Sequence, residues 1–144
     1  MTKKYELVLD DTIGFWGWKL FRIRALISFG SVEVGDLGGY IEKEDNLSHD
    51  GNAWVSGNAK VWGDAEVSGN AKVSELGDII VFKNHWSSGR HFTYTKSNKM
   101  WKAGCFYGTG QELIEKAYRD SEKSGNHYKA YVDFVESLEK LNDQ

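Results

Sequence analysis

Residues 79–110 hold the side chains best suited to binding a charged ligand. This segment contains five basic residues, two histidines and seven aromatic residues, but no acidic residue. Such a mixture suits an anionic ligand that carries a planar base, because cations bind phosphate and aromatic rings stack on the base. The predicted ligand-binding residues are Lys83, His85, Trp86, Arg90, His91, Tyr94, Lys96, Trp101, Lys102 and Thr109.

The segment Gly108–Gly110 adds a further anion-binding feature, since it precedes a predicted helix. Free backbone N–H groups at the N-terminus of a helix attract anions. Along a predicted strand, Arg90, Phe92 and Tyr94 share one face. His91, Thr93 and Thr95 share the other. The alternative interpretation is that the aromatic residues form a hydrophobic core and the lysines cover its solvated surface. The sequence leaves both interpretations open.

Cys105 is the only cysteine of the chain, and it lies just before the same glycines. A helix N-terminus lowers the pKa of a thiol, and His85 or His91 could act as a base, so a reactive thiolate is one interpretation. The residues on either side of Cys105 are typical of a packed strand, and we therefore expect a buried structural cysteine. One cysteine cannot form an internal disulfide, and no zinc-ligand spacing is present, so no cofactor or metal is predicted.

Charge is distributed unevenly along the chain, although the formal net charge is only -3. Residues 1–24 have a net charge of +2, residues 25–78 of -7, residues 79–110 of +5 and residues 111–144 of -3. A small basic segment beside an acidic one does not suit a long phosphate chain, so polymeric nucleic acid is not expected as a partner. No apolar run reaches the roughly 18 residues that span a bilayer, and no secretion signal is visible, so the sequence predicts a cytoplasmic protein without a membrane partner.

A six-residue period indicates how the middle of the chain is built. It is carried by three columns: Gly51, Gly57, Gly63 and Gly69; Ala53, Ala59, Ala65 and Ala71; and Val55, Val61, Val67 and Val73. A hexapeptide period predicts a parallel β-helix, with aliphatic residues inside and glycine turns between short flat sides. If three repeats complete a turn, residues 18 apart are neighbours. So few repeats make only about two coils, and we expect the rest of the chain to cap both ends.

The sequence pattern divides the chain into three segments. Residues 1–34 are predicted to form an N-terminal β cap, residues 35–80 the hexapeptide-repeat β-helix, and residues 81–144 a C-terminal α+β module. The module begins with strands, followed by a helix that Thr109 and Glu112 introduce with the spacing of a capping box. A second helix is expected after a break at 124–126. The predicted strands are 79–83, 91–96 and 100–106, which gives the order βββαα.

Four stretches of the chain resemble a group of bacteriophage and prophage hexapeptide-repeat proteins. They are FRIRAL at 21–26, GDLGGYIEKEDNLSHDGNAWVSGNAKV at 35–61, GRHFTYT at 89–95 and GCFYGTGQELIEKAY at 104–118. The hexad VSGNAK resembles the pattern of left-handed β-helices, and the last two stretches resemble the GCFxGT-type module that follows such repeats. The resemblance therefore implies a mainly β fold: a short left-handed parallel β-helix with an N-terminal strand cap and a C-terminal α+β (βββαα) module.

Three functions are compatible with these observations. The first is a non-catalytic phage or prophage accessory protein in the bacterial cytoplasm, which binds a small anionic, nucleotide-type ligand or a host protein and interferes with a host defence system. The second is a structural protein that assembles into a dimer or trimer through the repeat, with Trp62 facing outward. The third is an acyltransferase, since other hexapeptide-repeat proteins use a histidine base between subunits. His49 is the only histidine beside the repeat. We expect His49 to be a surface turn residue, which disfavours acyl transfer.

Overall fold

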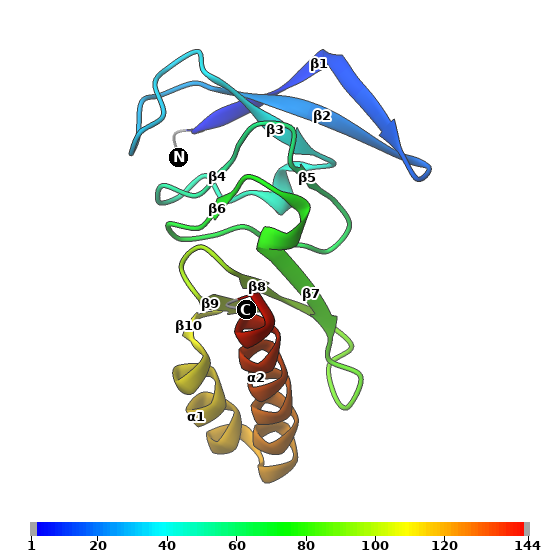
Figure 1. Ribbon diagram of the computed structural model, residues 1–144, viewed down its shortest axis with the longest axis vertical. Helices are drawn as coiled ribbons and strands as arrows, with labels where there is room; N and C mark the ends of the chain where they lie inside the picture. Colours follow the sequence, from blue (N-terminus) through cyan, green and yellow to red (C-terminus); the bar gives the residue numbers. More distant parts are fainter. Residues whose placement is uncertain (1–2, 143–144) are drawn as a thin grey trace.

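The computed structural model describes residues 3–142 and orders the elements along one long axis (Figure 1). The N-terminal hairpin lies at one end, the repeat follows, and a sheet separates the repeat from two helices at the other end. The strands are β1 (Tyr5–Phe15), β2 (Trp18–Ala25), β3 (Leu37–Ile41), β4 (Trp54–Val55), β5 (Lys60–Val61), β6 (Lys72–Val73), β7 (Ile79–Lys83), β8 (His91–Thr95), β9 (Met100–Ala103) and β10 (Phe106–Thr109). The helices are α1 (Gly110–Asp120) and α2 (Glu122–Asn142), with short 3-10 helices η1 (Glu44–Asn46) and η2 (Leu76–Asp78). The outer ends of the predicted terminal segments, residues 1–2 and 143–144, lie outside the described residues.

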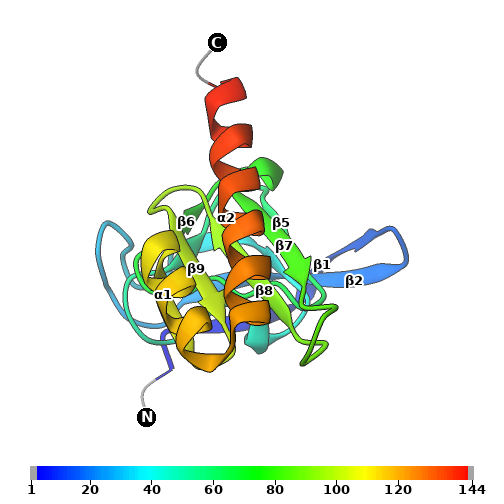
Figure 2. The same cartoon turned by 90° about the horizontal axis from the view of Figure 1, so that it is seen from below.

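The N-terminal strands form a mixed sheet with part of the repeat, in the order β1-β2-β3-β5. β1 and β2 pair antiparallel, with an irregularity between Val8 and Thr12, and β2 pairs antiparallel with β3. β3 then pairs parallel with β5. The tip of the β1–β2 hairpin extends beyond the rest of the molecule (Figure 2) and carries Trp16, which is highly exposed.

The repeat does not form the predicted left-handed parallel β-helix, and this fold assignment is wrong. A β-helix needs long stacks of parallel strands, whereas the structure has several antiparallel and mixed sheets of short strands together with two helices. Parallel pairing is limited to β3 with β5, β4 with β6 and one bridge between Leu47 and Val67. Every glycine of the period has a positive φ angle, so β4, β5 and β6 end after two residues. The expected pairing of residues 18 apart is confirmed for Trp54 and Lys72.

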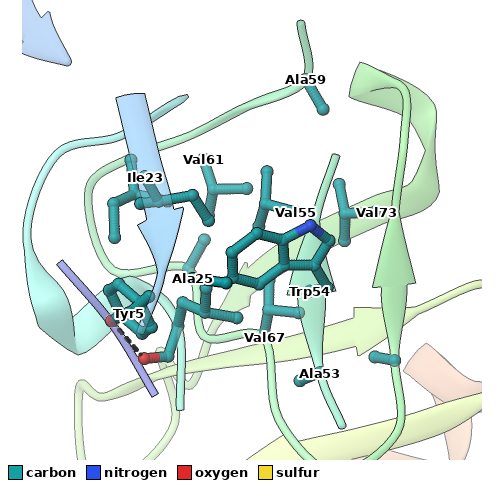
Figure 3. Packing of buried hydrophobic residues seen from close by; sticks show 14 residues of the cluster. Tyr5, Ile23, Ala25, Ala53, Trp54, Val55, Ala59, Val61, Val67 and Val73 are labelled. Carbon is teal, nitrogen blue, oxygen red and sulfur yellow. Dashed lines mark hydrogen bonds between the residues drawn. The ribbon is translucent and has the colours of Figure 1, made fainter. Parts of the chain in front are cut away.

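The aliphatic columns of the repeat point into a common core, as the period predicts (Figure 3). The valines and alanines of both columns are buried, and they form one cluster with Tyr5, Ile23 and Ile41 from the N-terminal strands. Trp54 belongs to the same cluster, and its ring meets that of Phe29 edge-on with 5.3 Å between the ring centres. The N-terminal strands therefore supply part of the core of the repeat.

Asn46 connects η1 to a later stretch of the repeat from a fully buried position. Its Oδ1 accepts hydrogen bonds from the backbone N–H groups of Glu42 (3.2 Å) and Lys43 (3.1 Å). Its Nδ2 donates to the carbonyl oxygens of Gly63 (3.1 Å) and Ala65 (2.9 Å). The amide is thus satisfied on both sides, which offsets the cost of burying it.

Lys4 is buried beside the same core, which is rare for a lysine. Its Nζ donates a hydrogen bond to the carbonyl oxygen of Ala53 (2.6 Å) and lies 4.7 Å from the centre of the Phe29 ring. Burial lowers the pKa of Lys4 to about 8, and the nearby charge of Asp50 opposes this effect. Burial also raises the pKa of the neighbouring Tyr5 hydroxyl. Alkaline pH therefore changes the stability of the fold in opposite directions through Lys4 and Tyr5.

The C-terminal sheet is antiparallel throughout, in the order β10-β9-β8-β7. It has one strand more than the predicted βββαα order, because the chain turns at Gly104 and returns as β10. The expected break at 124–126 is also wrong, since α2 begins at Glu122 and continues through these residues. Gly125 lies against the ring of Tyr118 in α1, where a Cβ atom would collide. The glycine therefore permits close packing of the two helices instead of ending one.

Both faces of the C-terminal sheet are covered, one by α1 and α2 and the other by the repeat (Figure 1). On the repeat side, Thr93 Oγ1 accepts a hydrogen bond from the backbone N–H of Glu66 (3.2 Å). The hydroxyl of Tyr107 donates to the carbonyl oxygen of Ser68 (3.2 Å). A Cβ atom at Gly69 would collide with the same Tyr107 side chain. The sheet and the repeat are thus in close contact.

We expect the substitution Asn46→Ala to lower the free energy of unfolding by about 3 kcal/mol, because several buried backbone groups lose their partners. Asn58→Ala is the matched control, since Asn58 is exposed in a turn of the same repeat. Its effect should stay below about 0.5 kcal/mol. Denaturant unfolding measures both values. Equal stabilities of the two variants would show that the Asn46 amide does not hold the repeat together.

The free energy of unfolding should rise between about pH 8 and pH 10 because of Lys4. The pKa of folded Lys4 is about 8 and its ordinary value is 10.5. The unfolded chain therefore binds more protons in this interval, and raising the pH favours the folded state. Tyr5 acts in the opposite direction only above its ordinary pKa of 10.0. Unfolding of Lys4→Met at several pH values should lack this rise, and a variant that retains it would contradict the assignment to Lys4.

Candidate functional site

Aromatic residues of the 79–110 segment make up much of the hydrophobic core of the C-terminal half. Phe92 and Tyr94 from β8 and Trp101 from β9 are almost fully buried between the sheet and the helices. The Tyr94 hydroxyl donates a hydrogen bond to Glu139 Oε1 of α2 (2.8 Å). Strand alternation explains this placement, since the even-numbered residues of β8 point toward the helices. These three rings are therefore not available for stacking on a ligand.

Two side chains of the same segment, Lys102 and His91, lie near acidic residues of the repeat. The charge of Lys102 lowers the pKa of Glu66, although burial is the larger effect and raises it. His91 Nδ1 lies 3.0 Å from Asp64 Oδ2. Lys102 and His91 therefore meet acidic side chains of the repeat at the junction between the sheet and the repeat. Part of the charge asymmetry in the sequence is thus balanced within the chain.

The ten predicted binding residues do not form one site. Three line a common cavity: Trp86, Arg90 and His91. Three line a different cavity beside the C-terminal half of α2: Tyr94, Trp101 and Thr109. The remaining four line neither cavity: Lys83, His85, Lys96 and Lys102. The segment is contiguous in sequence, but its strands and turns direct its side chains to separate surfaces.

The first of these cavities, hereafter the α2 cavity, has a volume of about 530 Å³. It lies where the β7–β8 loop, the β9–β10 turn and the start of α2 meet. Arg90, Lys116 and Lys123 line it, and Asp120 is the acidic residue of the lining. Lys116 forms an ion pair with Asp120 (3.0 Å). Within residues 3–142, Arg90 and Lys123 form no ion pair, so their charges are available to a ligand.

Serine hydroxyls add hydrogen-bond donors to the wall of the α2 cavity. Ser121 Oγ accepts from the N–H of Ser124 (3.0 Å), and Ser88 Oγ accepts from the N–H of Arg90 (3.2 Å). Ser124 Oγ in turn accepts from Trp86 Nε1 (3.2 Å). A hydroxyl that accepts such a bond keeps its own proton for donation. The wall therefore offers cations and hydroxyl donors together, which suits a small anion.

Trp86 lines the α2 cavity, but its ring is packed among other aromatic side chains. It stacks on His127, with 4.6 Å between ring centres and 21° between planes, and on Tyr131 at 5.8 Å and 23°. Tyr128 contacts it edge-on at 5.0 Å. The ring therefore anchors the β7–β8 loop to α2 and does not offer an open face to a planar base.

Sequence reasoning missed the part of the cavity that comes from the helices. Lys116, Lys123 and Tyr128 lie beyond residue 110, where no ligand-binding role was predicted. Ser121 was the available signal, because serine directly before a helix is a frequent N-cap. Recognising this cap would have placed the start of α2 before 124–126 and brought Lys123 to the helix N-terminus.

Thr109 has a structural role at the start of α1. Its Oγ1 accepts a hydrogen bond from the N–H of Glu112 (3.2 Å), and Glu112 Oε1 accepts one from the N–H of Thr109 (2.9 Å). Hydrogen bonds with the backbone and with the side chain of Thr109 hold the pKa of the Glu112 carboxyl below its usual range. The expected capping box is confirmed. The carboxylate of Glu112 occupies the position that the sequence assigned to an external anion.

His49 is committed to structural contacts through both ring nitrogens. Nδ1 accepts a hydrogen bond from the backbone N–H of Lys4 (3.0 Å), so the proton resides on Nε2, which lies 2.8 Å from Glu44 Oε1. This bond lowers the pKa of Glu44. The imidazole also stacks on the Tyr5 ring at 4.2 Å between centres. No free lone pair remains on the ring for use as a base.

Cys105 is exposed in the turn between β9 and β10, so the prediction of a buried cysteine is wrong. The predicted third strand ends at Ala103, and the turn carries the thiol to the rim of the α2 cavity. Within the described part of the chain, no three histidine, cysteine, aspartate or glutamate side chains are placed to share a metal ion.

No protein-family model matches this chain, and no curated protein sequence matches it. The resemblance to phage repeat proteins therefore stays a prediction. None of the helices between residues 3 and 142 is long and apolar enough to cross a membrane.

The substitution Thr109→Ala should destabilise the fold by about 1 kcal/mol through loss of the N-cap. It should leave binding of phosphate to the protein unchanged, because Thr109 is not part of the α2 cavity. Thermal unfolding and calorimetric titration of the variant measure the two effects. A variant of normal stability that no longer binds phosphate would show that Thr109 belongs to the ligand site.

Proposed function

We propose that this chain is a non-catalytic binding protein for a small anionic ligand, which enters the α2 cavity. The observation that carries the proposal is the meeting of Arg90 and Lys123, neither of them in an ion pair within residues 3–142, around one cavity lined with serine hydroxyls. Charge-assisted hydrogen bonds from guanidinium and ammonium groups are among the strongest contacts available to phosphate or carboxylate. The N-terminus of α2 adds the positive end of a helix dipole to the same wall.

The ligand class follows from the lining of the cavity. A volume of about 530 Å³ accommodates a molecule larger than inorganic phosphate. Since Trp86 is packed against His127, recognition rests on the anionic group rather than on a stacked base. Phosphomonoesters of small polar molecules fit these conditions best, and a nucleoside monophosphate would bind through its phosphate.

Two observations support a non-catalytic role over acyl transfer. Both nitrogens of His49 are occupied by hydrogen bonds, and the residue lies at the N-terminal end of the molecule, away from the α2 cavity. In the cavity itself, His91 Nδ1 lies 3.0 Å from Asp64 Oδ2 of the repeat, and within residues 3–142 no hydrogen bond joins a histidine to the Cys105 thiol. The resemblance to phage proteins adds the further proposal that the chain sequesters its ligand in the cytoplasm of a bacterial host and interferes with a host defence system.

Calorimetric titration with inorganic phosphate and with adenosine monophosphate tests the site. Arg90→Ala and Lys123→Ala should each weaken binding of either probe by about tenfold, because each removes one charge-assisted contact. Lys102→Ala is the control, since Lys102 carries the same charge but faces Glu66 of the repeat. Both affinities should fall as salt is added.

The titration has outcomes that contradict the proposal. Absence of binding by either probe to the wild-type protein would remove the anion site. A loss of affinity in Lys102→Ala as large as in Arg90→Ala would move the site to the repeat side of the sheet. Binding of adenosine monophosphate that Arg90→Ala and Lys123→Ala leave unchanged would mean that the base, not the phosphate, is recognised.

A further inference from the structure

β7 is the last strand of the C-terminal sheet, and its outer edge pairs with no other strand within residues 3–142. At the end of β7, the N–H of Asn84 donates a hydrogen bond to the carbonyl oxygen of Arg90 (2.8 Å). Bonded residues alternate along an antiparallel pair, so the even-numbered residues of β7 bond to β8. The N–H and C=O groups of Ile79, Val81 and Lys83 therefore point outward from the sheet.

This edge lacks the usual protection against strand addition. Natural edge strands are blocked by proline, bulges or several charges. The chain has no proline, and β7 pairs with β8 in regular register. Lys83 is the only charged residue of the strand. The edge is thus open to pairing with another strand.

Exposed apolar side chains lie on both sides of the β7 edge. On the helix side, Phe134 of α2 is 51% exposed, and its ring centre lies 6.4 Å from that of Phe82 in β7. On the repeat side, a groove of about 420 Å³ is lined by Trp18, Leu76 and Val81, all of them partly exposed. A strand added at this edge would cover apolar surface on each of its faces.

We propose that the β7 edge binds a second copy of the chain, with the two β7 strands antiparallel across a two-fold axis at Val81. In this register Val81 faces Val81 of the second copy, and Ile79 faces Lys83. The three residues whose backbone groups point outward then all form hydrogen-bonded pairs, in both copies. The antiparallel sheet continues from one copy into the other, and neither copy retains an open β7 edge.

Charge and symmetry favour a second copy over an unrelated segment. Each Lys83 lies beside the start of the other β7, where Glu75 and Asp78 supply carboxylates. A two-fold axis perpendicular to the sheet places both α2 helices on one face, with the exposed Phe134 rings near the axis. The same surface is therefore complementary to itself in hydrogen bonding, charge and apolar contact.

The test is the mass of the full chain in solution, measured by light scattering over a range of concentrations. The wild-type protein should approach twice the chain mass of 16.3 kDa as concentration rises. Val81→Lys and Val81→Glu should each raise the dissociation constant at least about tenfold, because like charges face each other across the axis. Val34→Lys is the matched control, since Val34 is exposed and belongs to the loop between β2 and β3, which lies away from β7 (Figure 1).

An equimolar mixture of Val81→Lys and Val81→Glu should form the dimer again, because opposite charges then meet at the axis. This rescue separates a lost interface from a misfolded variant. A wild-type chain that stays at 16.3 kDa at every concentration would overturn the proposal. A dimer that Val81→Lys leaves intact, or that Val34→Lys weakens equally, would place the interface elsewhere. A mixture that stays monomeric would overturn the two-fold register. None of these outcomes depends on the anion site.

Discussion

Packing on both faces of the β7–β10 sheet determines where a ligand can reach the C-terminal half of the molecule. The rings of Phe92, Tyr94 and Trp101 are enclosed between the sheet and the helices, and Thr93 and its neighbours contact the repeat. Both faces are therefore largely covered, apart from the groove beside β7 on the repeat side. The accessible positions are therefore the loops and turns at the end of the strands, together with the open edge of β7. The α2 cavity lies at the first of these places, and the proposed interface lies at the second.

The features that could be predicted from the sequence are those that depend on local periodicity or on short-range hydrogen bonding. The valine and alanine columns are buried because a residue's position within each six-residue unit decides whether it faces inward. The capping box of Thr109 and Glu112 forms because both partners lie within one helical turn. The predicted strand 79–83 coincides with β7, and the predicted strands 91–96 and 100–106 include β8 and β9.

The features that could not be predicted depend on contacts between distant parts of the chain. A hexapeptide period does not determine how far parallel pairing extends along the chain. Here β3 pairs antiparallel with β2 on one side, and the C-terminal strands form a separate antiparallel sheet. The glycine at 125 resembles a helix breaker until Tyr118 of α1 is seen to pack on it. The acid-free segment suggested an external anion, but Glu66 of the repeat lies near Lys102, and Asp64 of the repeat contacts His91.

Contacts between distant parts of the chain also explain why the residues that the helices contribute to the α2 cavity were not predicted. Arg90 and Trp86 lie in the segment that the sequence singled out, but Lys123 reaches the cavity only because α1 and α2 reverse the chain at Ser121. Trp86 also illustrates how a residue type can suggest one role and perform another. Its indole N–H holds the loop to Ser124, which positions the wall of the cavity.

The most direct test of the central claim is a titration of nitrogen-15-labelled protein with inorganic phosphate, followed through the backbone amide resonances. The account predicts that resonances of residues 87–90 and 121–124 shift together with one binding constant, because both stretches contribute residues to the lining of the α2 cavity. Resonances of residues 108–112, where the Glu112 carboxylate already occupies the helix start, should not move. Shifts confined to 108–112, or no shifts at all, would contradict the account.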